Sequence, residues 1–142
     1  GIPLVVAPGS LNYFCFGSAE EIPGSYQNRP THYHNPYNTN VRATAEECWR
    51  IGRELAVRLN EGKGPVAVLF PQHGWTENTR KGQPLHDPQA DRALVDAFME
   101  ARKPHVHVEF VEAHLNDAIF SERAVEILRK FISEKRGALS GP

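Results

Sequence analysis

VAVLFPQHG, from Val66 to Gly74, is the stretch that decides the fold of this 142-residue chain. Its first five residues are apolar and follow the breaker Gly64-Pro65, and the run ends at Pro71 and Gly74. A short apolar run bounded by turn residues is typical of a strand that is buried on both faces. We therefore predict a central strand of a parallel sheet here, and we expect functional residues at its carboxyl end.

The charge balance, apolar runs and cysteines of the chain limit the partners and compartments that fit it. Sixteen Lys and Arg residues against seventeen Asp and Glu residues give a formal net charge of -1, which disfavours nucleic acid and anionic membranes as partners. No apolar run approaches the roughly 20 residues of a membrane span. Cys15 and Cys48 form no CxxC pair, which fits a reduced cytoplasmic protein.

Patterns on both sides of residues 66–70 indicate an α/β domain. Apolar residues form a short strand at 4–7 and alternate with polar ones in a strand at 105–110, which we place at a sheet edge. Helical spacing and capping residues predict helices after Thr44, after Asp87-Pro88 and after Asp117, the last with an inner face of Val125, Leu128 and Ile132. We expect an ordered excursion at 10–42, with an extended piece at 31–34. The expected fold is a Rossmann-like or flavodoxin-like three-layer sandwich, with a mostly parallel sheet and helices on both faces.

The domain boundaries follow from these elements. We predict one domain over residues 1–136 and a frayed tail over 137–142. The chain opens with Gly1-Ile2-Pro3 and runs directly into a strand without an initiating Met. We therefore expect upstream sequence in the parent protein, so that part of this domain's sheet, or a whole neighbouring domain, is absent here.

Polar residues gather where the strands of this sheet should end. The carboxyl ends of parallel strands share one edge, so the segments after residues 7, 70 and 113 should converge there. These segments and the excursion supply the candidates for ligand binding, which are Gly9, Ser10, Asn12, His32, Asn35, Arg42 and Gly74. Gly9 and Gly74 would offer backbone N–H groups, and Arg42 would hold a phosphate or carboxylate. Neither a Walker A sequence nor GxGxxG is present.

Histidines give a second set of candidates. In an extended segment, His32 and His34 lie on the same side and could offer two ligands to a metal, with His114 as a further candidate. His34, His73, His114 and Asp117 are the candidates for acid/base chemistry. The alternatives stay open, because a histidine can simply bond to the backbone and Asp117 can simply cap a helix.

Several of these segments carry a family resemblance. They are Pro8-Gly9, Phe16-Gly17, RPTHYHNP at 29–36, Arg42 with Glu46-Glu47, and GQPLHDPQAD at 82–91. In this combination the chain resembles the carboxyl-terminal part of the tomato mosaic virus resistance protein-like family, whose members are described as ATP-binding. The resemblance implies a protein about twice this length with two Rossmann-like domains, of which this chain would be most of the second. It also implies ATP with Mg²⁺ as the expected cofactor. Asn12 departs from the family pattern, in which we expect Asp.

Three functions are compatible with these observations. The first is a nucleotide-binding domain of a two-domain cytoplasmic protein. The second is a metal-dependent hydrolase or lyase that acts on a small polar or carboxylate substrate, so whether the chain is an enzyme stays open. The third is a protein-interaction module that uses the aromatic residues between Tyr13 and Tyr37. Association into a homo-oligomer is compatible with each.

Overall fold

A parallel sheet of three strands organises the molecule, which a computed structural model describes over residues 1–139. The strands β1 (Leu4–Val6), β5 (Val66–Pro71) and β6 (Val106–Val111) lie in the order β1-β5-β6. Every residue of β5 is buried, and Val66 is in register with Leu4 on one side and with Val106 on the other. The predicted central strand and the α/β class are confirmed.

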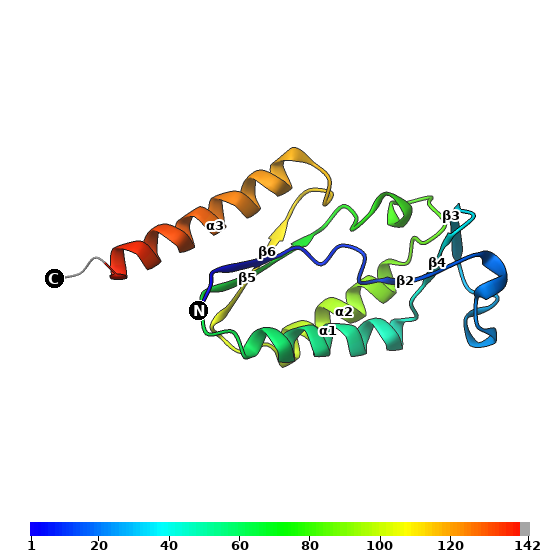
Figure 1. Cartoon of the computed structure of the whole chain (residues 1–142), viewed down its shortest axis with the longest axis horizontal. Coiled ribbons are helices and arrows are strands. Elements are labelled where there is room, and N and C mark those ends of the chain that lie inside the picture. Colours follow the sequence, from blue (N-terminus) through cyan, green and yellow to red (C-terminus); the bar gives the residue numbers. More distant parts are fainter. Residues whose placement is uncertain (140–142) are drawn as a thin grey trace.

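Helices cover both faces of this sheet, as the sandwich prediction requires (Figure 1). Helices α1 (Ala45–Asn60) and α2 (Pro88–Ala101) lie together on one face, over Val66, Val68 and Phe70. Helix α3 (Ala118–Leu139) covers the opposite face, over Ala67 and Leu69. Successive side chains of a strand point to opposite faces, so β5 supplies both cores.

Local sequence signals set the beginnings of α1 and α2. Thr44 accepts a hydrogen bond from the N–H of Glu47, whose side chain returns one to the N–H of Thr44. Asp87 accepts from the N–H of Ala90, and Pro88 occupies the first turn. Both predicted caps are confirmed, and they fix where each helix leaves its loop.

The two helices approach each other closely at Gly52 of α1. A Cβ atom at this position would lie 2.0 Å from the carbonyl oxygen of Leu94 in α2. Glycine is therefore required here, because any side chain would push the helices apart.

The excursion at 10–42 is a second, antiparallel sheet. Strands β2 (Tyr13–Phe16), β3 (Thr31–Asn35) and β4 (Asn38–Arg42) lie in the order β2-β4-β3, away from the carboxyl end of the chain (Figure 1). The predicted extended piece is β3, but the sequence analysis missed its two partners. Strand β4 reads NTNVR and is largely buried although mostly polar, so it lacks the alternation that marks a strand.

The aromatic residues of this second sheet divide into two groups. Phe14 and Phe16 pack against Tyr26, with ring centroids 5.3 and 5.1 Å from it. Tyr33 and Tyr37 are exposed. The aromatic residues therefore divide into a partly buried group, of which Phe14 also packs against the main core, and an exposed group at the β3–β4 hairpin end.

Helix α3 differs from its prediction in two respects. Its buried face carries Phe120, Ala124, Ile127 and Phe131, whereas Val125 and Ile132 of the predicted inner face are exposed. It also runs through Gly137 to Leu139, which belong to the predicted tail. Residues 140–142 of that tail lie outside the described residues.

Strand β6 lies at an edge of the sheet, as its alternating sequence predicts. Its His107 is exposed, whereas Val106 is buried. None of the helices described in residues 1–139 has the length and hydrophobicity needed to cross a membrane.

Candidate functional site

The loops that follow the three parallel strands converge, as predicted. The N–H of His73 donates to the carbonyl oxygen of Ala113 at 3.0 Å, and the N–H of Leu115 donates to that of Gly74 at 3.0 Å. A Cβ atom on Gly9 would lie 2.9 Å from the side chain of Leu115. The carboxyl edge of the sheet is therefore a junction of segments that are distant in the sequence.

A pocket of about 510 Å³ opens at this edge. It is lined by the end of β5 and its following loop, by residues 79–81, by the first half of α2 and by Phe110 of β6. Clefts at this place in α/β sheets are the usual ligand sites, and this volume suits a small organic molecule.

Two unpaired cations line the pocket. The exposed side chains of Lys81 and Arg92 make no hydrogen bond or ion pair within residues 1–139. Arg80 also lines it, but its guanidinium is held by Glu77 at 2.8 and 3.1 Å. The hydrogen bond from Arg80 lowers the pKa of the Glu77 carboxyl. Lys81 and Arg92 are therefore the cations that are available to a ligand.

Backbone N–H groups add to this positive character. Gly74 has a φ of 121°, which favours glycine, and a Cβ there would lie 2.7 Å from the ring of His114. Within residues 1–139, the N–H groups of Gly74 and Trp75 donate no hydrogen bond. Helix α2 also begins at the pocket, with Pro88 in its wall, so the positive end of its dipole lies nearby. The wall therefore contains two residues whose backbone N–H groups are unused within the described residues.

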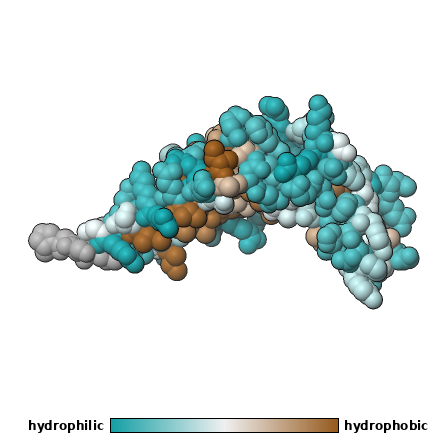
Figure 2. All heavy atoms as spheres, turned by 90° about the horizontal axis from the view of Figure 1, so that it is seen from above, coloured by the Kyte–Doolittle hydropathy of each residue, from teal (hydrophilic) through white to brown (hydrophobic). Residues whose placement is uncertain are grey.

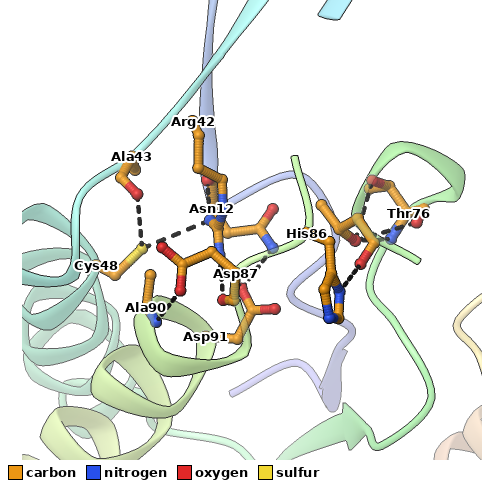
Figure 3. A network of polar contacts seen from close by, with 10 residues as sticks. Asn12, Arg42, Ala43, Cys48, Thr76, His86, Asp87, Ala90 and Asp91 are labelled. Carbon is orange, nitrogen blue, oxygen red and sulfur yellow. Dashed lines mark hydrogen bonds and ion pairs between the residues drawn. The ribbon is translucent and has the colours of Figure 1, made fainter. Parts of the chain in front are cut away.

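Arg42 lies in a polar cluster with Asn12, Asp87 and Asp91 (Figure 3), and Asp91 of this cluster lines the pocket. Only 2% of the Arg42 side chain is exposed, and its guanidinium donates to the carbonyl oxygens of Asn12 and Asp87 and to the Asp91 carboxylate. The Oδ1 atom of Asp91 also accepts from the Asn12 amide at 2.7 Å. The predicted phosphate contact of Arg42 is corrected by this geometry, because its guanidinium is an internal counter-charge that joins β4 to the segment before β2 and to the start of α2.

Asp91, like Lys81, Arg92 and Phe110 of the pocket wall, was missed by the sequence analysis. It belongs to the Arg42 cluster and also lines the pocket. Burial raises the pKa of its carboxyl above the ordinary 3.8, against the opposing effect of Arg42. The available signal was its position in the first turn of a helix capped by Asp87, where a buried arginine could find a counter-charge.

Cys48 closes the inner side of the Arg42 cluster. Its Sγ lies 3.8 Å from the Arg42 guanidinium and 3.9 Å from the carbonyl oxygen of Ala43 (Figure 3). Burial raises the pKa of this thiol to about 11, so it stays protonated at neutral pH.

The other predicted binding residues all lie outside the pocket wall. The Gly9 N–H is used by the carbonyl oxygen of Ala7, and the Ser10 hydroxyl accepts from Tyr13. Asn12 is in the Arg42 cluster, and Asn35 shapes the β3–β4 turn through a bond from the N–H of Tyr37. Gly74 alone among the seven predicted binding residues lines the pocket.

The acid/base candidates are separated by their surroundings. His73 lines the pocket with 59% of its side chain exposed, and its Nε2 lies 3.2 Å from Glu112. His114 is fully buried, and its Nδ1 accepts from the N–H of Asn116. The Asp117 carboxylate accepts from the backbone N–H of His114 at 2.8 Å, so it closes the turn before α3. His34 lies on β3, in the other sheet.

The predicted metal candidates are not assembled into a site. The rings of His32 and His34 lie side by side on β3, with centroids 6.0 Å apart, as the extended segment predicts. Among residues 1–139, however, no group of three or more His, Cys, Asp or Glu side chains could hold a metal ion. His114 is not part of such a group.

Sequence comparisons agree with the predicted resemblance. Residues 1–132 match the C-terminal domain of the uncharacterised protein family UPF0261. A UPF0261 protein of Brucella suis is 31% identical over 134 residues, which cover 94% of this chain and 32% of that protein. One of Rhizobium meliloti is 35% identical over 130 residues, covering 90% and 33%. The ToMV resistance protein Tm-1(GCR237) of Solanum lycopersicum is 29% identical over 127 residues, covering 88% and 17%.

The chain thus spans about a third of the length of the bacterial relatives that it matches. Its match with the family's C-terminal domain extends over nearly all of its length. On these grounds the chain belongs to the UPF0261 family.

Proposed function

We propose that the pocket at the carboxyl edge of the sheet binds a nucleotide, with ATP as the first candidate. The observation that carries this proposal is the pairing of two unbonded cations, Lys81 and Arg92, with two unbonded backbone N–H groups, at Gly74 and Trp75, in one pocket wall. Cations and free N–H groups beside a helix N-terminus are the usual partners of phosphate.

An aromatic surface in the same pocket supports a nucleotide over a simple anion. Phe110 is 46% exposed although it is large and apolar, and its ring stacks on Phe70 with centroids 5.7 Å apart. A ring held in this way can receive the flat face of a base, since stacking on an aromatic side chain contributes about 1–3 kcal/mol per base. We assign the phosphates to the Lys81 and Arg92 side of the pocket and the base to the Phe110 side.

Asp91 gives this site a link to the protein interior. Its carboxylate lines the pocket while Arg42 and Asn12 hold it from behind. Because Arg42 balances its charge, Asp91 repels a phosphate less than a free carboxylate would. The exposed Asp96 is the other acidic residue of the wall, and it would favour binding in the presence of Mg²⁺.

We also place this activity in the cytoplasm. Both cysteines are free thiols, and Cys15 is exposed. An exposed free thiol is more compatible with a reducing compartment than with an oxidising one.

The first test is a calorimetric titration of ATP, with and without Mg²⁺, into this chain and into the longer protein. We expect saturable binding, and we expect Arg92→Ala to weaken it by about tenfold, the effect of losing one charge-assisted hydrogen bond. Phe110→Ala should weaken ATP more than it weakens inorganic triphosphate.

Lys63→Ala is the matched control for this titration. Lys63 is exposed and adjoins Gly64-Pro65, at the amino-terminal end of β5. Its substitution therefore removes one positive charge far from the pocket. The affinity of the Lys63→Ala variant for ATP should stay within twofold of the affinity of the unsubstituted chain. Absence of ATP binding by both the chain and the longer protein, or equal losses for Arg92→Ala and Lys63→Ala, would contradict the proposal.

A further inference from the structure

The two edges of the parallel sheet differ in chemistry. Strand β6, at one edge, carries His107 and Glu109, and Glu109 is bonded to Arg123 of α3 at 2.6 and 2.9 Å. Strand β1, at the other edge, reads Leu-Val-Val and carries no charged residue. Natural edge strands are protected by charges, whereas strands inside a parallel sheet are apolar throughout. By this criterion β6 has the sequence of a natural edge strand, and β1 has the sequence of an interior strand.

Exposed apolar residues continue along this edge. Leu4 of β1 is 43% exposed, and Ile2, just before the strand, is 85% exposed. The N–H of Leu4 donates to the carbonyl oxygen of Pro65. Because alternate residues of a parallel strand bond to the same neighbour, Val6 also faces β5 and the N–H and C=O groups of Val5 face the open side. Strand β1 therefore presents both apolar side chains and a backbone able to pair.

Helix α3 has a second apolar stripe. Beside its buried face it carries Val125, Leu128 and Ile132 at helical spacing, and Val125 and Ile132 are 47% and 38% exposed. A helix with one buried face needs one apolar stripe, so a wider apolar arc indicates that a second surface packs against it.

The stripe faces the side of β1. Arg123 lies on the flank of α3 that reaches β6, through its bonds to Glu109. Spacing of 3.6 residues per turn puts Val125 and Ile132 on the opposite flank of the buried face. Helix α3 packs over β1 and β5, and Lys135 near its end reaches the carbonyl oxygen of Gly1. Figure 2 shows hydrophobic residues gathered in a band beside the carboxyl-terminal tail, where α3 lies in Figure 1.

We propose that the open edge of β1 and the outer stripe of α3 together form one docking surface, and that its occupant is a strand with a packed helix from the part of the protein outside these 142 residues. The relatives supply the reason for this choice of occupant, because about two thirds of their length lies outside the match. A doubly wound sheet also has helices on both of its faces on each side of its switch point. Within residues 1–139, α3 is the one helix that packs on its face of the sheet. The added strand would pair with Val5, and its helix would cover Val125, Leu128 and Ile132.

One test uses a pair of matched substitutions, Val125→Glu in the stripe and Val57→Glu on α1. The two valines are 47% and 46% exposed in this chain, so each change should leave its proteolysis rate within twofold. In the longer protein, Val125→Glu should raise the rate of proteolysis at least tenfold, because it buries a charge at the interface. Val57→Glu should raise it less than twofold. Equal behaviour of the two variants in the longer protein would overturn the proposal.

A second test needs no substitution. Amide hydrogen exchange at Val5 should be slowed at least about tenfold in the longer protein relative to this chain, because its N–H gains a partner. Equal exchange in the two would overturn the proposed strand pairing. Sedimentation of this chain settles the choice of occupant: a monomer is expected, and a dimer separated by Val125→Glu would assign the surface to a second copy instead.

Discussion

Arg42 and Arg92 lie on either side of Asp91 and show two different uses of an arginine. Arg42 is 2% exposed and donates to Asn12, Asp87 and Asp91. Arg92 is exposed in the wall of the pocket and makes no bond to the protein within residues 1–139. A buried guanidinium must have partners because its desolvation is costly, whereas an exposed one is served by water. The first arginine therefore serves the fold, and the second is available to a ligand.

The position of the cluster explains why the fold needs it. Asn12 precedes β2, Arg42 ends β4, and Asp87 and Asp91 belong to the cap and first turn of α2. The cluster thus joins the antiparallel sheet to the main domain through hydrogen bonds. It also fixes the beginning of α2, which forms part of the pocket wall.

The largest effect should come from Arg42→Ala. The substitution leaves the Asp91 carboxylate buried without its counter-charge, and removing one partner of a buried pair typically costs about 3–5 kcal/mol. Urea unfolding followed by circular dichroism would measure the free energy of unfolding. Arg50→Ala is the matched control, because within residues 1–139 Arg50 has one partner, Glu46 on α1, and their bond is exposed. It should change that free energy by at most about 0.5 kcal/mol. A loss below about 1 kcal/mol for Arg42→Ala would show that the cluster does not support the fold.

Asp91→Asn should have a smaller effect, with a characteristic pH dependence. The amide keeps an acceptor for Arg42 and avoids burying a charge, so we expect a cost of about 1 kcal/mol at pH 7. Burial raises the pKa of Asp91 in the folded chain above the ordinary 3.8, so the folded chain binds this proton more tightly than the unfolded chain does. Protonation of Asp91 therefore stabilises the fold at pH values below 3.8, and this contribution is lost as the pH rises through the folded-state pKa. The cost of Asp91→Asn should therefore be larger at pH 4 than at pH 7.

Urea midpoints of both proteins between pH 4 and pH 7 would measure this difference, since the other titrations are shared by the two chains. A cost that grows as the pH rises would show instead that the ion pair with Arg42 outweighs the burial of Asp91. In that case the charge of Asp91 would stabilise the fold, as the charge of Arg42 does.

The parallel sheet was predictable because its signals are local. The run from Val66 to Phe70 is apolar throughout, so its own composition predicts that it is buried. Thr44 and Asp87 mark the starts of their helices through side chains that bond to N–H groups only three residues away. Strand β4 was not predictable in this way. Its polar residues Thr39 and Asn40 are buried because β4 lies between β3 and the more distant β2, where they pair with Phe16 and Cys15. No periodic pattern reports such neighbours.

The site was predictable in its place but less so in its residues. The convergence of the three loops follows from the parallel arrangement alone, and Gly74 was found by that argument. Arg42 looked equally suited to a ligand or to a surface position, because the sequence does not show that Asp91 would meet it across 49 positions. The stripe of α3 shows the same limit, since Val125, Leu128 and Ile132 have helical spacing whether they face this sheet or another surface.

The smallest effect on stability should come from Arg92→Ala. Its side chain is exposed and has no partner within residues 1–139, so its loss should change the free energy of unfolding by at most about 0.5 kcal/mol. With saturating ATP present, however, the unsubstituted chain should gain stability by mass action, and Arg92→Ala should gain less at the same ATP concentration. Thermal melting with and without ATP measures both quantities, with Lys63→Ala as the control that keeps the full gain. If Arg92→Ala instead destabilised the chain without ligand as much as Arg42→Ala does, the distinction between a cation for the fold and a cation for a ligand would fail.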